Sequence, residues 1–329
     1  MAKLVTIYGG AGFVGRYIAR RMAKEGWRVR VAVRRPNESL HVKPYGAVGQ
    51  VEPIFCNIRD DASVRAAMQG SDAVINCVGV LTERGKNSFA AVQSEGAGRI
   101  AKIATELGVP RLVHLSAIGA DNASQSDYAR TKAEGEAAVV SAFPGAVILR
   151  PSVIFGIEDG FFNRFGKMAA KIPFVLSIVG GDTKFQPVYV DDVAQAAVAG
   201  ALGTAPAGVY ELGGPDVDTL KGMIGKMLVS IRRRRLIINL PFWVGRIMAT
   251  GFSVAQFLTG GLFHNGILTK DQVKNLAVDN VVSDGAKGFS DLGIKPTAMK
   301  IILDDYLWVY RPHGQFEAVR ESAKGLREY

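Results

Sequence analysis

The sequence contains few cysteines and few histidines, and these shortages exclude several classes of protein. Only two cysteines, Cys56 and Cys77, occur in 329 residues, which is too few for a disulfide framework. We expect both to be buried free thiols in a reducing compartment. The four histidines lie in distant segments and the cysteines lack the spacing of metal ligands, so no metal site is expected.

A secretory signal and an uninterrupted apolar segment of membrane-spanning length are also missing. Residues 1–8 pass directly into a strand-like pattern, without a basic region, an apolar core and a cleavage site, which indicates a protein that stays in the compartment where it is made. Residues 247–269 carry no charged side chain, but four glycines and several polar residues interrupt the run. We therefore expect this segment not to span a membrane.

Apolar residues and positive charge are plentiful. Hydrophobic residues make up 48% of the chain, which is enough for a large core, and the length favours about two domains. The 40 basic and 30 acidic side chains leave a formal net charge of +10. This excess predicts an acidic partner, a membrane surface or a phosphorylated ligand.

Strand-like and helix-like segments alternate in the first half of the chain. Short β-branched runs end at glycine or polar turns, and segments of helical composition lie between them. This alternation predicts an α/β protein with a Rossmann-type doubly wound parallel sheet in the strand order 3-2-1-4-5-6. The expected strands are 4–8, 28–33, 51–55, 73–77, 111–115 and 146–149, and the expected helices are 13–24, 62–68, 89–107 and 128–143.

After residue 150 this rhythm becomes sparser. We divide the chain into a first domain, residues 1–155, and a smaller mixed α/β part, residues 156–329, from which strands and helices return to the first domain. The second part is expected to contain helices at 191–202, 219–231, 270–278 and 296–309, a strand at 208–212 and a loosely packed polar tail from Arg311.

The sharpest signal is a glycine-rich loop between the first strand and the first helix. Gly9, Gly12 and Gly15 follow each other at Gly-x-x-Gly-x-x-Gly spacing. Such glycines permit the tight turn, the approach of a pyrophosphate and close helix–strand packing, while the helix start at Phe13 and Val14 presents free N–H groups. The first domain is therefore predicted to bind a dinucleotide here. No Gly-Lys-Ser/Thr follows, which excludes the phosphate loop of nucleotide hydrolases.

The end of the second strand has no acidic residue. A site for NAD presents Asp or Glu to the ribose 2′-hydroxyl at this point, whereas the chain has Arg34 and Arg35. Arginine suits a 2′-phosphate because it forms charge-assisted hydrogen bonds with the phosphate oxygens. The sequence therefore favours NADPH over NADH.

The glycine spacing resembles the short-chain dehydrogenase/reductase superfamily, especially its extended and atypical branches. In that superfamily the segments after the third, fourth and sixth strands adjoin the adenine, its ribose and the nicotinamide. The resemblance implies nucleotide contacts by Asn57, Ile58, Val78, Gly79, Val80, Pro151 and Val153.

Tyr128 and Lys132 form a Tyr-x-x-x-Lys motif, whose spacing places the phenol and the ammonium on one face of a helix. In reductases of the superfamily the Tyr donates a proton, the Lys lowers its pKa and holds the nicotinamide ribose, and a Ser orients the substrate oxygen. The resemblance assigns the Ser role to Ser116. It implies cofactor contacts for all three residues, and a catalytic role for them if the chain is a reductase.

The chain as a whole resembles the NAD(P)H-binding accessory subunits of respiratory complex I, an atypical family of this superfamily. Residues 9–17, 185–194, 268–273 and 279–283 carry the resemblance. It implies a tightly held structural NADPH, no independent catalytic activity, and contacts with other subunits of the peripheral arm and the membrane junction. Without a transit peptide, we expect the chain at the cytoplasmic face of a bacterial inner membrane, or on the matrix side if it is organellar.

Two features of the second half agree with an interface. Residues 240–258 are apolar on every helical face, and such a segment needs cover. The run Arg232–Arg235 suits anionic lipid headgroups. This run lacks interleaved aromatic residues, so no nucleic-acid partner is expected.

A free-standing NADPH-dependent reductase or epimerase remains the alternative, because Ser116, Tyr128 and Lys132 are all present. Residues 172–181 and 242–263, however, are mostly apolar or glycine, whereas a sugar-nucleotide substrate needs polar anchors. This composition favours an accessory subunit over a free-standing reductase or epimerase.

Overall fold

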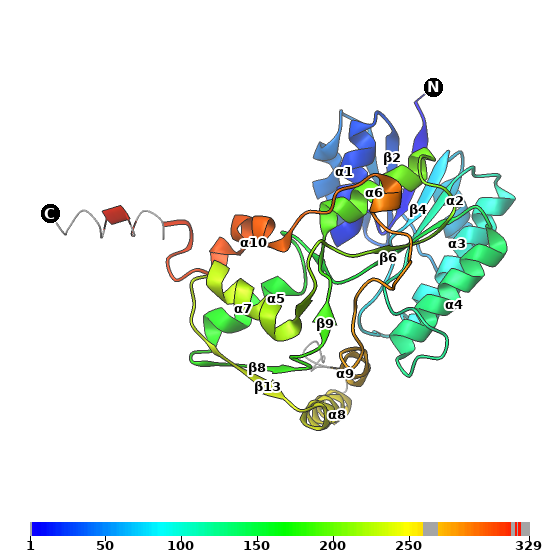
Figure 1. Ribbon diagram of the computed structural model, residues 1–329. Helices are drawn as coiled ribbons and strands as arrows, with labels where there is room; N and C mark the ends of the chain where they lie inside the picture. Colours follow the sequence, from blue (N-terminus) through cyan, green and yellow to red (C-terminus); the bar gives the residue numbers. More distant parts are fainter. Residues whose placement is uncertain (1, 259–268, 317–319, 321, 324–329) are drawn as a thin grey trace. The chain divides into compact units, whose positions relative to one another are not determined.

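The computed structural model describes residues 2–258, 269–316, 320, 322 and 323, with only the helical backbone for 252–258. The chain forms two compact units (Figure 1). The first unit comprises Met1–Ser152, Val190–Gly213 and Val282–Pro296, and the second comprises Val153–Tyr189, Gly214–Val281 and Thr297–Tyr329. Two later segments of the chain thus return to the first unit.

A seven-stranded parallel sheet forms the centre of the first unit, with the strand order β11-β6-β5-β4-β1-β2-β3. This order confirms the predicted doubly wound sheet, and the predicted strands differ from the observed ones by at most two residues at either end. The strands are β1 (Leu4–Tyr8), β2 (Arg28–Val33), β3 (Val51–Phe55), β4 (Ala73–Asn76), β5 (Leu112–Leu115), β6 (Val147–Pro151) and β11 (Gly208–Leu212).

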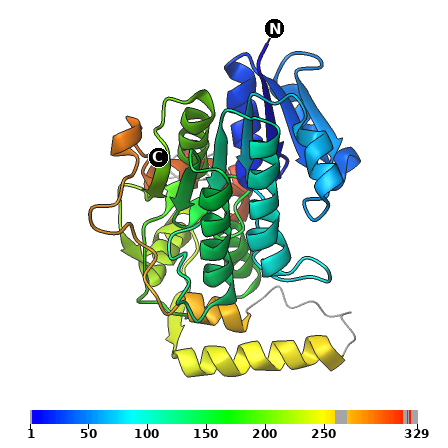
Figure 2. The ribbon, with the colours of Figure 1, turned by 90° about the vertical axis from the view of Figure 1, so that its right-hand side faces the viewer.

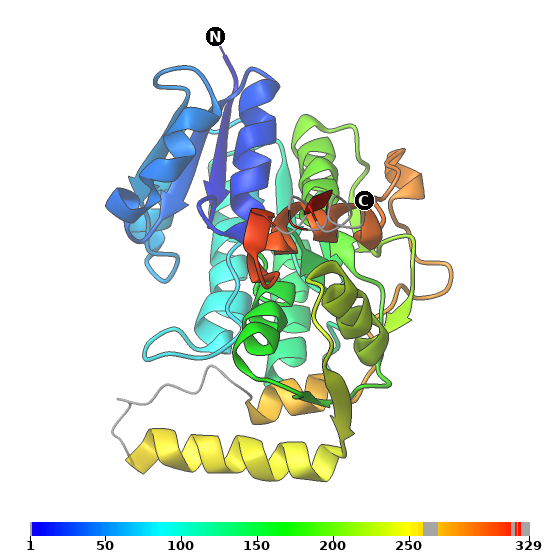
Figure 3. The ribbon, with the colours of Figure 1, turned by 90° about the vertical axis from the view of Figure 1, so that its left-hand side faces the viewer.

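Helices cover both faces of this sheet. Helices α1 (Phe13–Lys24) and α6 (Val190–Leu202) pack together on one face (Figure 3), and α3 (Glu95–Glu106) and α4 (Asp127–Ala142) stand side by side on the other, next to α2 (Asp61–Met68) (Figure 2). Their inward faces are apolar; Val74, Ile100 and Leu112 are almost completely buried between the sheet and α3. The predicted helix 89–107 is two elements, the π-helical η2 (Ala90–Ser94) followed by α3.

A buried charge network ties α4 to the sheet. The Arg150 guanidinium on β6 donates to both carboxylate oxygens of Glu136 on α4, at 2.6–3.1 Å, and lies 3.5 Å from Glu211 on β11. The second Glu211 carboxylate oxygen accepts the Ser283 N–H at 2.8 Å. Because Glu136 and Glu211 are both more than 90% buried, Arg150 supplies the compensating charge for two carboxylates.

The second unit contains three two-stranded sheets and five α-helices among its described residues. Its core is formed by α5, α7 and α10, with Phe162, Met223 and Leu303 buried. Its strand pairs are β8 (Val175–Val179) with β13 (Leu236–Leu240), β7 (Ile154–Phe155) with β10 (Val188–Tyr189), and β9 (Lys184–Phe185) with β12 (Asp218–Thr219); its helices are α5 (Phe162–Lys171), α7 (Leu220–Ser230), α8 (Phe242–Leu258), α9 (Lys270–Asn275) and α10 (Met299–Leu307).

Several expectations need correction. Helix α5 and strands β8 and β13 were not predicted, and Leu240 ends a strand rather than belonging to the apolar helix. Cys56 is a buried free thiol as predicted, but Cys77 is only partly buried because it lies in the turn after β4. Shorter elements complete the fold, namely η1 (Pro36–Tyr45), η3 (Ser290–Leu292), η4 (Trp308–Tyr310) and η5 (Gly314–Phe316).

Some sequence features fall outside the described residues. These are Leu268, His264, the side chains of 252–258, and most of the tail beyond Phe316. Among the helices that the structure does describe, none combines the length and apolar character needed to cross a bilayer.

The Arg150 network generates a stability prediction. Replacing Arg150 with Met leaves two buried carboxylates without their counter-charge, which is expected to lower the free energy of unfolding by about 3–5 kcal/mol. The control is Arg130→Met, which removes the more exposed pairs with Asp127 and Glu134 on the surface of α4 and is expected to cost at most about 1 kcal/mol. Urea denaturation measures both, and equal effects would contradict the assigned role.

Candidate functional site

The glycine loop packs so tightly that its glycines cannot carry side chains. A Cβ on Gly15 would lie 2.4 Å from the Gly9 carbonyl oxygen and 2.6 Å from the Gly10 Cα. Gly9 has a φ of +74°, a conformation that L residues with side chains rarely adopt, and its N–H donates to the Ala32 carbonyl of β2. The first turn of α1 is thereby held directly against the ends of β1 and β2.

Helix α1 starts without a capping side chain. Gly12 occupies the N-cap position, no side chain accepts from the first turn, and the first turn contains no acidic residue. The N–H groups of Phe13, Val14 and Gly15 have no intrahelical acceptor, and they point out of the positive end of the helix dipole. These donors, together with the absent side chains, form a cradle that fits a pyrophosphate.

Three arginines come from segments that border this cradle. Arg34 and Arg35 follow β2, whose carboxyl end lies beside the loop, and both side chains are exposed. Arg16 was not predicted as a site residue, although it directly follows the last glycine. Its guanidinium donates to the Ala11 and Gly12 carbonyls at 3.3 Å, so it lies over the loop.

The segment after β3 is shaped by local hydrogen bonds. The Asn57 side-chain oxygen accepts the Arg59 N–H at 3.2 Å, and the Asn57 N–H donates to the Ser63 hydroxyl at 2.9 Å. Ile58 is buried, and a Cβ on Gly96 would lie 2.7 Å from its Cδ1. This turn presents the half-buried Asn57 at the same edge of the sheet as the glycine loop.

The turn after β4 also meets the loop. A Cβ on Gly9 would lie 3.2 Å from the Val78 Cγ2, which places Val78 directly against the glycine turn. Asn76 fixes this turn by accepting the Val78 N–H at 3.1 Å. Gln93, which no sequence motif marks, donates from its buried amide to the Val80 carbonyl at 2.7 Å.

Lys132 reaches the same turn from α4. Its Nζ would lie 3.4 Å from a Cβ on Gly79, and it donates to the Leu115 carbonyl at 3.1 Å. Burial lowers the pKa of Lys132 to about 8, although Glu136 and Cys77 act in the opposite direction. The predicted residues Gly79 and Lys132 are thus brought together at the carboxyl edge of the sheet.

Ser116 and Tyr128 complete this region. The buried Ser116 hydroxyl has no hydrogen-bond partner among the described residues. Burial raises the pKa of Tyr128 to about 12, and its ring packs edge-on against Phe89 at 5.9 Å between ring centres. This direction is opposite to the one that the resemblance implies for a proton donor.

The remaining predicted residues divide between the units. Pro151 ends β6, and its carbonyl accepts the Ile118 N–H at 3.0 Å, just beyond β5. Val153 belongs to the second unit, where its carbonyl accepts the Val188 N–H at 3.0 Å. The predicted contact segment after β6 therefore continues from one unit into the other.

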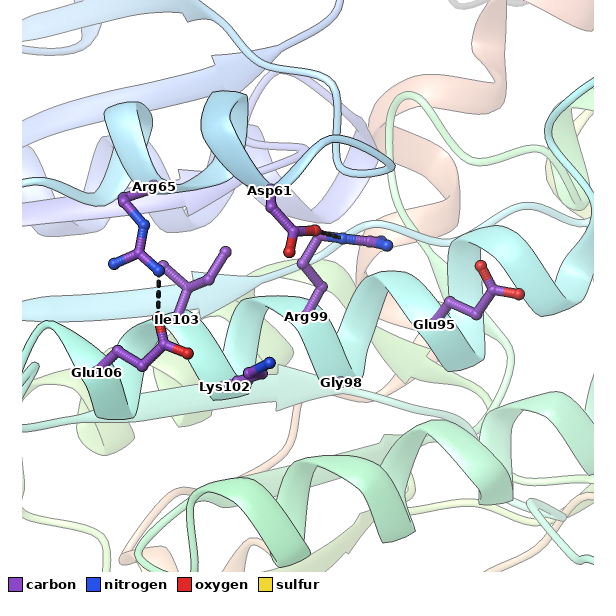
Figure 4. A pocket seen from close by; sticks show the side chains of 8 residues that line it. All are labelled: Asp61, Arg65, Glu95, Gly98, Arg99, Lys102, Ile103 and Glu106. Carbon is purple, nitrogen blue, oxygen red and sulfur yellow. Dashed lines mark hydrogen bonds and ion pairs between the residues drawn. The ribbon is translucent and has the colours of Figure 1, made fainter.

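The two clearest surface pockets lie elsewhere. One, of about 250 Å³, lies between α2 and α3, where the ion pairs Arg65–Glu106 and Arg99–Asp61 cross it (Figure 4). The other, of about 420 Å³, belongs to the second unit and is lined by Asn239 and Phe242, among others. Neither contains a predicted site residue. The described residues also contain no group of three or more His, Cys, Asp or Glu side chains that could hold a metal ion.

The site residues of the first unit fit a dinucleotide. The glycine cradle supplies room and N–H donors, Lys132 supplies a buried cation, and the Ser116 hydroxyl supplies a buried polar group that still lacks a partner. Unsatisfied buried polar groups are rare in folded proteins and point to a missing ligand or water.

The close approach at Gly15 can be tested directly. Gly15→Ala places a methyl group against backbone atoms of the loop, and such overpacking is expected to cost about 1–3 kcal/mol of unfolding free energy. Gly225→Ala is the matched control, because a Cβ there meets nothing within 4 Å on α7. The control is expected to stabilise the protein by about 0.5–1 kcal/mol. Thermal or urea denaturation distinguishes them, and a neutral Gly15→Ala would contradict the packing argument.

Comparison with known proteins places this geometry in a family. Residues 5–213 match the NAD dependent epimerase/dehydratase family. The mitochondrial NADH dehydrogenase (ubiquinone) 1 alpha subcomplex subunit 9 of Arabidopsis thaliana is 37% identical over 317 residues, 94% of this chain and 79% of the relative. The mitochondrial NADH-ubiquinone oxidoreductase 40 kDa subunit of Neurospora crassa is 31% identical over 98% of this chain and 84% of the relative.

A solved structure shares the fold at lower identity. An NADPH-dependent quinone oxidoreductase from Escherichia coli, crystallised with NADPH, superposes with a TM-score of 0.70 at 17% identity, over 92% of this chain and 99% of that one. The chain belongs to the NAD dependent epimerase/dehydratase family and, within it, to the group that contains these mitochondrial NADH dehydrogenase subunits.

Proposed function

We propose that this chain is an accessory subunit of a respiratory complex I, in which it holds a dinucleotide as a structural group and stabilises the peripheral arm near the quinone chamber and the membrane. The observation that carries the proposal is the length of the similarity. The complex I relatives align with 94–98% of the chain, so the likeness extends through the second unit as well as the glycine loop.

The dinucleotide is a nicotinamide dinucleotide, and we favour NADPH. The family is NAD dependent, and a protein with the same fold was solved with NADPH. Arg34 and Arg35 stand where a site for NAD places an acidic residue, so a ribose 2′-phosphate has cations to pair with, whereas a 2′-hydroxyl lacks its usual acceptor.

The environment of Tyr128 supports a structural rather than a reactive role for the nucleotide. Reduction of a carbonyl adds a hydride to the carbon and a proton to the oxygen, so a reductase site contains a group that can give up that proton. Burial raises the pKa of Tyr128 to about 12, well above the neutral range in which a general acid works best. Lys132 and the Ser116 hydroxyl can still hold the ribose, because binding needs only their hydrogen-bonding groups.

The surface of the second unit supports partner contacts. Phe174, Leu236, Trp243 and Ile247 are each more than 60% exposed, and large exposed apolar side chains mark interaction sites. The basic run Arg232–Arg235 is only partly free for headgroups: Arg233 donates to the Tyr310 carbonyl at 2.7 Å, and Arg235 caps the end of α5 through the Ala169 and Ile172 carbonyls. Arg234 is exposed and suits anionic lipid headgroups.

These surfaces support a peripheral membrane location. The relatives are mitochondrial proteins. We place this chain at the cytoplasmic face of a bacterial inner membrane, or on the matrix side if it is organellar. Its partners are other complex I subunits of the peripheral arm and the membrane junction.

A free-standing NADPH-dependent reductase or epimerase is the second candidate. The retained set of Ser116, Tyr128 and Lys132 favours it, because these are the groups that reduction of a carbonyl needs. The two candidates predict different locations and different effects of a single substitution.

Tyr128→Phe separates the candidates in the native membrane. The chain is tagged at its chromosomal locus, and gently solubilised membranes are resolved on a native gel. The subunit proposal predicts that wild type and Tyr128→Phe co-migrate with NADH dehydrogenase activity in one large complex, in equal amounts. A soluble, uncomplexed wild-type protein whose NADPH-dependent carbonyl reduction disappears in Tyr128→Phe would contradict it and establish the alternative.

A further inference from the structure

The two neighbouring arginines after β2 are not equivalent. The Arg35 Nη1 lies 3.0 Å from the Glu38 Oε1, and both side chains are largely exposed, at 75% and 66%. Arg34 is also exposed, but it forms no ion pair or hydrogen bond with a side chain of the described residues. One cation of the pair is therefore already engaged by a carboxylate of the same chain.

The backbone holds Glu38 in this position independently of the ion pair. Arg35 is the N-cap of η1, and its carbonyl accepts the Glu38 N–H at 3.2 Å and the Ser39 hydroxyl at 3.2 Å. Glu38 also lies in the first turn of η1. The backbone of Glu38 is thus anchored beside Arg35 by contacts that do not involve either charged side chain.

We propose that Glu38 is a specificity-determining residue, which competes with the ribose 2′-phosphate for Arg35 and so limits the preference of the site for NADPH over NADH. The inference rests on the proposed dinucleotide site and adds a residue that tunes it. NADPH carries the additional phosphate at the point where NADH has only a hydroxyl, so the competition affects NADPH alone.

The exposure of the pair sets the size of the effect. An exposed ion pair contributes little to stability because water and salt screen it, so Arg35 can leave Glu38 for a phosphate at small cost. Losing the Arg35–Glu38 ion pair therefore changes the affinity for NADPH by about fivefold at most. The Glu38 carboxylate also repels the doubly charged ribose 2′-phosphate directly, and this repulsion weakens as the ionic strength rises.

The test measures NADPH and NADH binding separately. Purified full-length chain, freed of nucleotide by exchange, is titrated with each dinucleotide at low and at high ionic strength. We expect Glu38→Gln to tighten NADPH binding about three- to fivefold at low salt and to leave NADH binding unchanged. The gain is expected to shrink at high salt, and to be clearly smaller when Arg35→Gln is already present, because only the direct repulsion between Glu38 and the phosphate then remains to be relieved.

Glu25→Gln is the matched control, because it removes the same charge. Glu25 follows the last residue of α1, which runs away from the loop for about 18 Å. Its substitution is expected to leave both affinities unchanged.

Three outcomes would overturn the inference: unchanged or weaker NADPH binding in Glu38→Gln, the same gain in the Arg35→Gln background, or a loss of NADH affinity, which would make Glu38 the partner of the ribose hydroxyls. If the wild-type chain binds neither dinucleotide, the proposed function itself is contradicted. Failure of the Glu38 inference and failure of the proposed dinucleotide site therefore give different results.

Discussion

Helix α1 can begin beside the Gly9–Gly10 turn only because residue 15 has no side chain. This close approach determines the rest of the site. It aligns the first turn of α1 with the ends of β1 and β2, leaves three N–H groups without acceptors, and brings the turn at Val78 against Gly9. The order of the sheet then places the ends of β3, β4 and β5 along the same edge. A single steric condition therefore positions groups from distant parts of the chain.

Helix α4 is anchored by a buried ion network rather than by apolar packing alone. Lys132 and Glu136 lie one turn apart on this helix; the first faces Gly79, and the second pairs with Arg150 on β6. Arg150 also neutralises Glu211, which accepts the Ser283 N–H from the returning segment. The element that carries the Tyr-x-x-x-Lys motif thus depends on charged side chains from β6 and β11 and on a backbone N–H of the returning segment. Such a network holds geometry even if no reaction takes place.

The sequence predicted the first unit well because each local signal agreed with the fold. The buried parallel strands are short and mostly apolar, as in Leu4–Tyr8, where only Thr6 is polar, and the glycine spacing marks the loop without reference to any distant residue. Strands β8 and β13 could not be predicted in this way. They pair across more than 50 residues, and their exposed positions, such as Leu236, break the alternation that marks a strand.

The candidate site likewise contains residues that local sequence marks and residues that only their contacts in the fold reveal. The glycines and the pair Tyr128 and Lys132 are recognisable from spacing, Arg34 from its place after the second strand, and Ser116 from the resemblance to the superfamily. The structure brings most of them to one edge of the sheet. Gln93 and Glu38 are not recognisable, since their roles depend on the contacts of Gln93 with Val80 and of Glu38 with Arg35. The raised pKa of Tyr128 is likewise a property of burial, which a motif does not report. A motif names the groups present; their environment decides what they can do.

The measurement that tests the central claim most directly is the identity and redox state of the nucleotide in the assembled complex. The tagged chain is purified together with its native membrane assembly, the bound nucleotide is extracted and identified, and the absorbance of its reduced nicotinamide is followed while NADH and quinone turn over. The account predicts one NADP(H) per chain that stays bound and does not change its redox state during turnover. An empty or freely exchanging site, or a nucleotide oxidised in step with quinone reduction, would contradict it.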